Sequence, residues 1–562
     1  MFKNLLLAFI MMSSSFAGVT EKLAELGEKY IEYRSRYFPV WATSVGIFDY
    51  DSLLTDYSSE AVFAYRNNIS KILQNLRRMK PNKMSADNYI DYQLLMANIK
   101  YDEFILAKFS YHEHSPAVYV DDALNSLYYI LIDNSRTPEE KSPFLLKRLK
   151  AIPVFLEQKW AYQPYMDKVF YEVAIESAGE GTKLIEEVAQ MLYKAMPDSI
   201  KRAARYKMGA IDALKNYKRF CKIEMKDANE KHFIGKNQFN YLLKNIHFLN
   251  IDSDSLKKIG WYWYNKSNDA IDSLQQITNN KILESDNVFP VPDSLTEKDI
   301  LEYYQWEIDQ TADFFRQNDI LTIPDEIGDC IPAEMPEFMR AIRKGIAYQP
   351  PAPFSADQTG YFYVRPIPTL DSTAVLEYSK MIRNRGFKGS AVHEAYPGHH
   401  LQLSIANQHP SKIRRIQQNT MFTEGWALYC EEMATREGLF KNDDLVERWK
   451  GVYGGIRFRA VRVIVDCSLA DSTMTPDSAL VFMNKMLGDN TEYFTAEIRR
   501  YCSYPTQALS YLTGKLYIMD MLGQSREKEG KSFSLKKFHD SILAEGTIPP
   551  ALISEKLGYI NK

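Results

Sequence analysis

The spacing of apolar residues constrains the fold of this chain more than any other feature. Between Ser59 and Pro81, apolar residues recur at intervals of three and four, the period of one face of an α-helix. The series is Val62, Tyr65, Ile69, Ile72 and Leu76. The same period follows Thr20 in Leu23, Leu26, Tyr30 and Tyr33. Both segments are therefore predicted to be amphipathic helices.

Two further segments carry helical signals. Thr296 followed by Asp299 has the pattern of a capping box and predicts a helix that starts there. Residues 253–276 predict another helix, with Trp261, Trp263 and Tyr264 on its surface. We interpret these aromatic stripes as parts of the core.

Strand signals are scarce. The segment Tyr361–Arg365 has strand character, but it runs into Pro366 and Pro368. Because proline cannot donate to a ladder, this segment is predicted to be an edge strand or the lining of a cleft rather than part of a large sheet. The chain is thus predicted to be mainly α, with at most a small β element.

Proline clusters at Phe289–Pro292 and Gln349–Pro353 predict loops. We place a boundary at the first, which divides the chain into a helical N-terminal half, 18–290, and a helical C-terminal half, 291–562. With 562 residues the chain could form several domains, but the two halves could equally form one continuous body.

The N-terminus resembles a secretory signal. Leu5–Met12 is an apolar run behind Lys3, too short to span a bilayer, and Ser15–Gly18 supplies the small residues for cleavage after Ala17. Residues 1–17 are therefore predicted to be a signal peptide, and the mature chain to be periplasmic or extracellular. No cysteine follows the apolar run, so no lipid anchor is indicated.

Charge and cysteine content exclude other classes. Lys plus Arg number 69 and Asp plus Glu 72, so no positive field favours nucleic acid as a partner, and no membrane span is expected. The five cysteines are few and form no C-x-x-C pair, which argues against a disulfide framework or a thiolate zinc site. Most of them are predicted to be small buried apolar residues.

Three of nine histidines fall within eight residues, in His-Glu-Ala-Tyr-Pro-Gly-His-His at 393–400. Imidazoles with an adjacent carboxylate are what a zinc hydrolase uses to hold metal and to deprotonate its water. We therefore predict His393 as a metal ligand and Glu394 as the general base.

The spacing departs from the usual H-E-x-x-H, because position 397 is proline. On a straight helix neither His399 nor His400 could share one metal with His393. Pro397 and Gly398 disfavour a regular helix and push Tyr396 out of the α region. A bulge or restart there could bring His399 to the second ligand position.

The next predicted helix supplies a third ligand. It follows a break at His409-Pro410 and carries Glu424 and Glu431 on one face. Glu424 is the predicted ligand, and Glu431 is predicted to orient a ligand imidazole. The alternative for Glu431 and Glu432 is a solvated helix face.

Four motifs in order resemble the bacterial family called domain of unknown function 885. They are His-Glu-Ala-Tyr-Pro-Gly-His-His-Leu-Gln at 393–402, Glu-Gly-Trp-Ala-Leu-Tyr at 424–429, Arg-x-x-Arg-x-x-x-Asp at 459–466, and Arg-Tyr-x-x-x-Pro-x-Gln-Ala-x-x-Tyr-x-x-Gly at 500–514. The resemblance covers about 360–550 and weakens upstream to length and helical character.

This resemblance implies a large helical, metallopeptidase-like body with a deep cleft. The metal helices more distantly resemble those of carboxypeptidase Taq and thimet oligopeptidase, which supports Glu424 by position and favours His399 over His400. One departure is Ala470, where the family pattern has a histidine. If that histidine acts on substrate in relatives, this chain needs another donor or has lost efficiency.

Three side chains near the end of the pattern could serve as donors. Tyr501 or Tyr511 could hydrogen-bond an oxyanion, with core packing as the alternative, and Arg500 could bind a substrate carboxylate or form a structural ion pair. Arg459, Arg462 and Asp466 are predicted to form a structural salt-bridge set beneath the site. His539 is predicted to be structural.

The expected function is that of an exported peptidase with one zinc ion as cofactor and short peptides as substrates. One alternative is a metal-containing peptide-binding protein whose catalysis is impaired, motivated by Ala470. A second alternative is a structural helical protein whose histidine cluster is incidental.

Overall fold

The computed structural model describes residues 2–158, 167–229, 234–277, 289–292, 294–335, 346–365, 367–368 and 370–559. Helices dominate it, as predicted. The helices are α1 (Phe2–Tyr37), α2 (Pro39–Ser44), α3 (Ser59–Arg78), α4 (Ala86–Glu103), α5 (Tyr111–His114), α6 (Ala117–Leu131), α7 (Pro138–Glu157), α8 (Lys168–Ala195), α9 (Ile200–Glu224), α10 (Lys236–Asn245), α11 (Ser253–Gln275), α12 (Glu297–Gln317), α14 (Ser372–Arg383), α15 (Lys388–Ser390), α16 (His399–Asn407), α17 (Lys412–Arg415), α18 (Thr420–Arg436), α19 (Leu445–Ala470), α20 (Pro476–Leu487), α21 (Thr491–Ser503), α22 (Gln507–Glu529), α23 (Leu535–Leu543) and α24 (Pro550–Leu557). Short helical turns are η1 (Pro81–Lys83), η2 (Phe104–Lys108), η4 (Pro197–Ser199), η5 (Met225–Asp227), η6 (Ala391–Ala395) and η7 (Gly530–Ser532).

Local signals place several helices as predicted. Ser58 accepts a hydrogen bond from the Ala61 N–H and caps α3. The five apolar residues of the predicted stripe are the buried residues of α3. Thr296 and Asp299 form the reciprocal hydrogen bonds of a capping box at the start of α12.

The aromatic face of α11 is less buried than predicted. Trp261 is 40% exposed, and its ring packs edge-on against Phe482 of α20, 5.8 Å between centroids. The prediction that this stripe belongs to the core is therefore wrong for Trp261, because the neighbouring helix covers only part of the indole.

The strands form one small sheet, in the order β1 (Cys330–Glu334), β3 (Gly360–Val364) and β2 (Ala347–Gln349). β1 pairs with β3 in parallel and β2 pairs with it antiparallel. The predicted edge strand is thus the central strand. It ends at Val364, two positions before Pro366 in the sequence.

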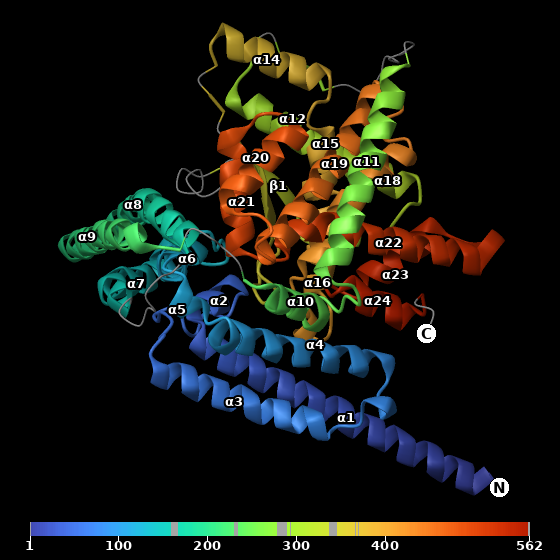
Figure 1. Cartoon of the computed structure of the whole chain (residues 1–562), viewed down its shortest axis with the longest axis horizontal. Coiled ribbons are helices and arrows are strands. Elements are labelled where there is room, and N and C mark those ends of the chain that lie inside the picture. Colours follow the sequence, from blue (N-terminus) through green and yellow to red (C-terminus); the bar gives the residue numbers. More distant parts are fainter. Residues whose placement is uncertain are drawn as a thin grey trace.

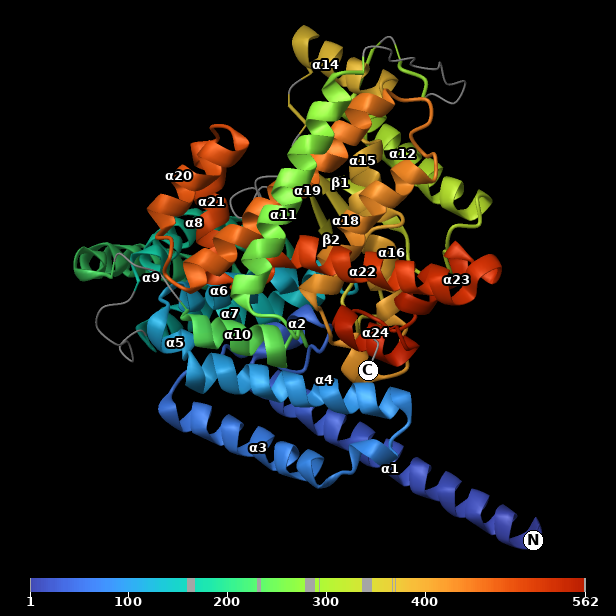
Figure 2. The same cartoon turned by 45° about the vertical axis from the view of Figure 1, so that its right-hand side comes forward.

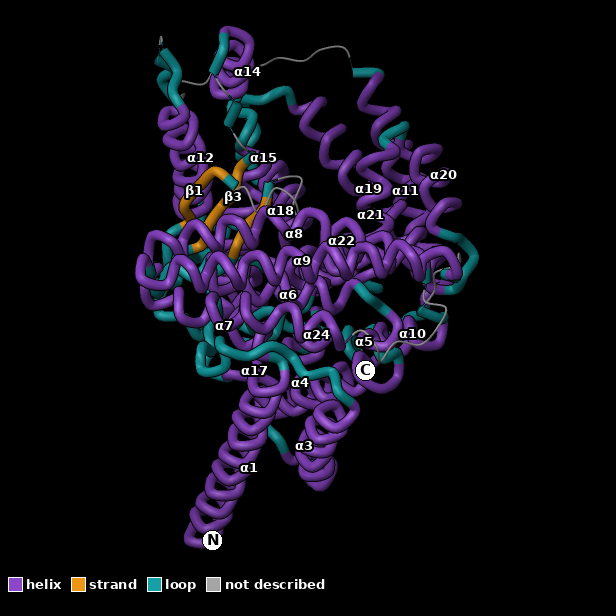
Figure 3. Tube along the Cα trace, turned by 90° about the vertical axis from the view of Figure 1, so that its left-hand side faces the viewer, coloured by secondary structure: helices purple, strands orange, loops and turns teal. Residues whose placement is uncertain are grey.

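α12 packs against β1 of this sheet (Figure 1). α1, α3 and α4 form a layer at one end, and α7, α8 and α9 form a group beside it (Figures 1 and 2). α11 and α19 run side by side in both views, while α1 projects from the body toward the N-terminus (Figure 3). Within the described part of the chain, no helix is both long enough and apolar enough to cross a bilayer.

One hydrophobic core contains residues from both predicted halves, including Leu26, Ile69, Trp426 and Ile553. The boundary near residue 290 itself stays a prediction. The five cysteines are buried, as predicted, and none of them forms a disulfide with another described residue. The predicted signal peptide falls on residues 1–17, whose side chains lie outside the described residues.

Candidate metal centre

The backbone around the histidine cluster departs from a regular helix as predicted. The wide turn η6 holds His393, Tyr396 leaves the α region with φ −116° and ψ 129°, and the peptide bond before Pro397 is cis. A Cβ at Gly398 would overlap the carbonyl oxygen of His393, so only glycine allows this close return of the chain. The helix restarts as α16 at His399.

This restart brings two imidazoles together. The rings of His393 and His399 lie with centroids 4.9 Å apart and planes at 89°. Glu424, one turn into α18, completes the group, with His399 Nε2 3.5 Å from its carboxylate oxygen. One potential ligand atom from each of these three residues lies within 4.8 Å of the others. We call His393, His399 and Glu424 the ligand cluster.

Glu431 holds the His393 ring in place. Its carboxylate oxygen lies 2.8 Å from His393 Nδ1, which leaves Nε2 as the ring nitrogen that is free to bind a metal. The neighbouring Glu432 is buried and pairs with Lys515 at 2.6 Å. Neither carboxylate therefore lies on a solvated helix face, the alternative considered for both.

The charges around the cluster favour a cation. Burial lowers the pKa of His393, but the hydrogen bond to Glu431 and the charges of Glu394 and Glu424 outweigh it and raise that pKa to about 9. Burial likewise raises the pKa of Glu424, yet His399, His393 and Tyr511 lower it to about 2. Three carboxylates thus face two imidazoles, and the group attracts positive charge.

His400 faces a different part of the protein. Its Nδ1 is 2.8 Å from the Tyr348 hydroxyl and its Nε2 is 2.9 Å from the Gly328 carbonyl oxygen. Burial lowers its pKa to about 4, so the ring is neutral. The structure therefore brings His399, and not His400, to His393. His400 instead ties α16 to β2.

Glu394 follows His393 in η6 and is partly buried. Its charge raises the pKa of His393 and that of Cys330 in β1. Among the described residues, no hydrogen bond or ion pair engages the Glu394 carboxylate.

Of the three predicted donors, only Tyr511 reaches the ligand cluster. A hydrogen bond from Tyr511 helps to lower the pKa of Glu424. Tyr501 instead donates to Glu497 at 2.8 Å, and Arg500 pairs with Glu497 and Gln507. The structure gives these two side chains structural partners, although a catalytic role for them stays untested.

The predicted salt-bridge set does not form, because no ion pair joins Arg459, Arg462 and Asp466 to one another in the described part of the chain. Arg462 lies 4.1 Å from the Tyr511 ring centroid and 3.9 Å from Glu497. Asp466 makes no ion pair with another described residue. It accepts the backbone N–H groups of Thr506 and Leu509 and so caps α22, because the start of this helix needs acceptors.

Two further predictions concern His539 and Ala470, which are not members of the ligand cluster. His539 is structural, as predicted, since its Nε2 meets the Tyr429 hydroxyl at 2.8 Å and its Nδ1 meets the Ile320 carbonyl oxygen. Ala470 lies in an apolar cluster with Met421 and Leu509.

Sequence reasoning missed two supports of the site. The Trp426 indole N–H donates to the Pro397 carbonyl oxygen at 2.7 Å and fixes the irregular turn to α18. Because a buried indole N–H needs an acceptor, the tryptophan in this motif could have indicated such a hydrogen bond. The second support is the close crossing of α18 and α22 at Gly425 and Gly514, where neither helix has room for a Cβ.

Comparisons extend the resemblance over the whole fold. The family model described as "Bacterial protein of unknown function (DUF885)" matches residues 39–557, far upstream of the predicted limit near 360. A solved structure described as "a putative lipoprotein of unknown function from Shewanella oneidensis" has a TM-score of 0.75 and 18% identity, covering 95% of this chain and 99% of that chain. One described as "the putative lipoprotein from Colwellia psychrerythraea" has a TM-score of 0.74 and 19% identity, with coverage of 96% and 99%. No curated protein matches the chain significantly. At these identities the solved structures show a common fold and nothing more.

Proposed function

Because the chain belongs to the DUF885 family, whose description assigns no activity, we propose a function from its site: an exported, zinc-dependent peptidase that hydrolyses short peptides. The observation that carries the proposal is the convergence of His393, His399 and Glu424 beside Glu394. Two imidazoles and one carboxylate are the protein ligands of many catalytic zinc sites, which keep a fourth position open.

The residues present fit zinc. With bonds of about 2.1 Å, two ligands of a tetrahedral zinc lie about 3.4 Å apart. The 3.5 Å between His399 Nε2 and Glu424 agrees with that value. Glu431 supplies the carboxylate that usually receives the second ring nitrogen of a zinc-bound histidine.

In this proposal, Glu394 and Tyr511 have separate roles in peptide hydrolysis. A bound zinc supplies Lewis acidity, which polarises a carbonyl group and acidifies water. Glu394 accepts the proton of the attacking water and returns it to the leaving amine. Tyr511 lies beside Glu424 and under the guanidinium of Arg462, and it would transfer its one hydrogen bond from Glu424 to the developing oxyanion.

Export and substrate class rest on separate observations. The apolar run with a cleavage signal at residues 1–17 supports export, and the description of both solved structures as "putative lipoprotein" agrees with it. Peptides are proposed as substrates because the motifs resemble those of the zinc peptidases named above.

A second candidate is a metal-containing peptide-binding protein without turnover. Ala470 favours it, because this position carries a histidine in the family pattern. It predicts bound zinc and peptide affinity but no cleavage.

Zinc analysis and peptide hydrolysis test the proposal together. Wild type should hold one zinc per chain and cleave members of a short-peptide library. Glu394→Gln should keep the zinc and lose cleavage, whereas His399→Ala should lose both. Glu437→Gln and His114→Ala change exposed residues and serve as matched controls. Equal cleavage by wild type and Glu394→Gln would refute Glu394 as the base, and zinc without cleavage in wild type would favour the second candidate.

A further inference from the structure

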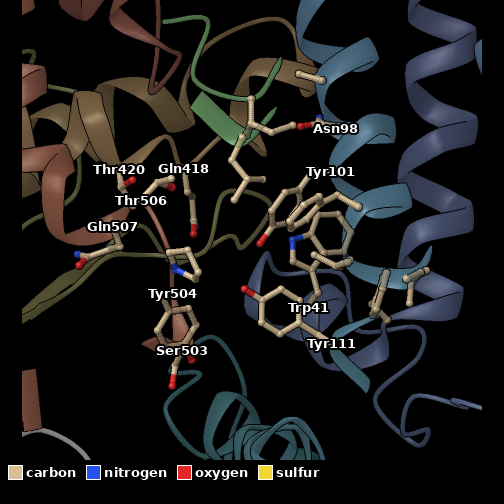
Figure 4. A pocket seen from close by; sticks show the side chains of 18 of the residues that line it. Trp41, Asn98, Tyr101, Tyr111, Gln418, Thr420, Ser503, Tyr504, Thr506 and Gln507 are labelled. Carbon is tan, nitrogen blue, oxygen red and sulfur yellow. The ribbon is translucent and has the colours of Figure 1, made fainter. Parts of the chain in front are cut away.

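A cavity of about 570 Å³ lies between the N-terminal helices and the starts of α18 and α22 (Figure 4). Its volume is within the range of pockets that enclose small ligands, roughly 300–1,000 Å³. Trp41, Tyr101 and Tyr111 line one side, and Thr420 and Gln507 lie on the opposite side. The cavity could therefore hold a short peptide segment between two walls of different character.

The cavity comes within about one helical turn of a member of the ligand cluster. Thr420 and Gln507 line it, and Glu424 and Tyr511 each follow four residues later on the same helix. Four residues advance a helix by about 6 Å, and helical side chains lean toward the N-terminus. Glu424 and Tyr511 are thus directed toward this end of the cavity.

The side chains of Tyr101, Tyr111 and Tyr504, which line the cavity and are here called the aromatic wall, are accessible to a ligand. Tyr101 is 40% exposed and Tyr504 is 57% exposed, and both rings line the cavity. The hydroxyl groups of Tyr101, Tyr111 and Tyr504 make no hydrogen bond within the described part of the chain. The wall thus presents both ring faces and free hydroxyl groups to a ligand.

The charges facing the cavity leave one carboxylate uncompensated. Arg34 is paired with Asp102, and burial lowers the pKa of His112 and of His247, which keeps both rings neutral. Asp121 lines the cavity and forms no ion pair with another described residue. Burial raises its pKa to about 7, although a hydrogen bond from Ser177 opposes this, so a cation bound beside it would favour the charged carboxylate. Asp121 and Tyr504 line the same cavity, and the charge of Asp121 is the largest cause that raises the pKa of Tyr504.

We propose that this cavity binds the primary ammonium group of the peptide substrate, with Asp121 as its counter-ion and the rings of Tyr101 and Tyr504 around it. Cations are stabilised by aromatic faces and by desolvated carboxylates, and both occur here. The rest of the peptide extends past Thr420 and Gln507 toward Glu424. This inference rests on the proposed peptidase function, and it names the substrate class as ammonium-bearing peptides. The ammonium group belongs either to the peptide N-terminus or to a lysine side chain.

Calorimetric titration of the full mature chain, in the zinc-loaded Glu394→Gln form that leaves peptides intact, tests the inference. The probes are three tetrapeptides of one sequence: one with a free N-terminus and norleucine first, one N-acetylated with lysine first, and one N-acetylated with norleucine first. At least one ammonium-bearing peptide should bind about tenfold more tightly than the neutral one. Which of the two gains identifies the source of the ammonium group.

Variants assign the effect to Asp121. Asp121→Asn should abolish the preference, and Asp122→Asn, at the neighbouring position outside the cavity lining, should keep it. Tyr504→Leu, at an exposed ring that should tolerate replacement, should weaken the preference and covers the case in which Asp121→Asn fails to fold. Equal binding of all three peptides, or a preference that survives in Asp121→Asn, overturns the inference.

The wild-type protein separates the inference from the proposed function. Zinc-dependent cleavage of all three peptides at equal affinity would overturn the ammonium site and leave the peptidase proposal standing. An Asp121-dependent preference without any cleavage in wild type would support the ammonium site and count against the peptidase proposal.

Discussion

The Nδ1 atom of His393 lies 2.8 Å from a carboxylate oxygen of Glu431, seven residues beyond Glu424 on α18. One helix therefore carries both a member of the ligand cluster and the group that orients another member. The position of α18 therefore determines where Glu424 lies and how the His393 ring is oriented. Replacement of Glu431 tests whether this orientation serves metal binding.

Removal of Glu431 should weaken zinc binding. Glu431→Ala deletes the acceptor that holds the His393 ring, and we expect zinc affinity to fall roughly 10- to 100-fold. Glu431→Gln retains an oxygen acceptor and should lose less. Competition with a calibrated chelator measures the affinities, with Glu437→Gln as control. Unchanged affinity in Glu431→Ala would show that the imidazole needs no support.

Two tyrosines near the end of the family pattern should behave differently. Tyr511→Phe removes a hydroxyl beside Glu424, and we expect kcat to fall roughly a hundredfold with zinc content and KM little changed. Tyr501→Phe removes a donor to Glu497 and should cost about 1 kcal/mol of stability without a change in kcat. Steady-state kinetics and urea unfolding measure both. Equal kcat values for the two variants would contradict the assignment of Tyr511.

The crossing of α18 and α22 should not tolerate a larger residue at Gly514. A Cβ there would overlap the Met421 carbonyl oxygen, so Gly514→Ala should destabilise the fold by about 3 kcal/mol and lower zinc affinity. Gly523→Ala is the matched control, because it lies in the same helix with nothing near its Cβ and should be neutral or stabilising. Urea unfolding distinguishes them. Similar stabilities would mean that the helices can separate at no cost.

The contrast between these glycines shows what could be predicted from the sequence. The stripe of α3 and the capping box of α12 are local patterns, and they predicted the helix and its buried face correctly. The roles of Gly425 and Gly514 depend on a helix crossing. No local pattern reveals such a contact, since a helical glycine is otherwise merely unfavourable.

The same distinction holds at the site. The Pro-Gly step predicted a break before His399, but the placement of His400 depends on Tyr348 in β2, a strand of only three residues. The central position of β3 likewise depends on partners with weak strand signals, one of which contains Pro332. The choice between Tyr501 and Tyr511 also required the packing of α21 and α22.

The buried carboxyl group of Asp466 should make stability depend on pH. Burial raises its pKa to about 7, against the lowering effect of its backbone hydrogen bonds, whereas an unfolded aspartate has a pKa of about 3.9. The folded state therefore holds a proton that the unfolded state has already released between about pH 4 and pH 7. Since stability falls with rising pH wherever the folded state binds more protons, this group destabilises increasingly across that window and constantly above it.

Asp466→Asn mimics the protonated form and should remove this dependence. The difference in the free energy of unfolding, variant minus wild type, should be larger at pH 8 than at pH 5. Urea unfolding of both proteins at the two pH values measures the difference. If the gap between them were the same at pH 5 and pH 8, the carboxyl group would not be the source of the dependence.

Removal of metal should lower stability if the ligand cluster binds zinc only in the folded state. At free zinc a hundredfold above its Kd, binding should add about 2.7 kcal/mol to the free energy of unfolding, and a chelator should remove it. His399→Ala should show no such difference, because one ligand is missing. Urea unfolding with zinc and with chelator measures the effect in both proteins. A ligand that binds only the native state must stabilise it. If wild type unfolds at the same urea concentration in both conditions, the cluster therefore binds no zinc. His393, His399 and Glu424 would then be a polar cluster held by mutual hydrogen bonds.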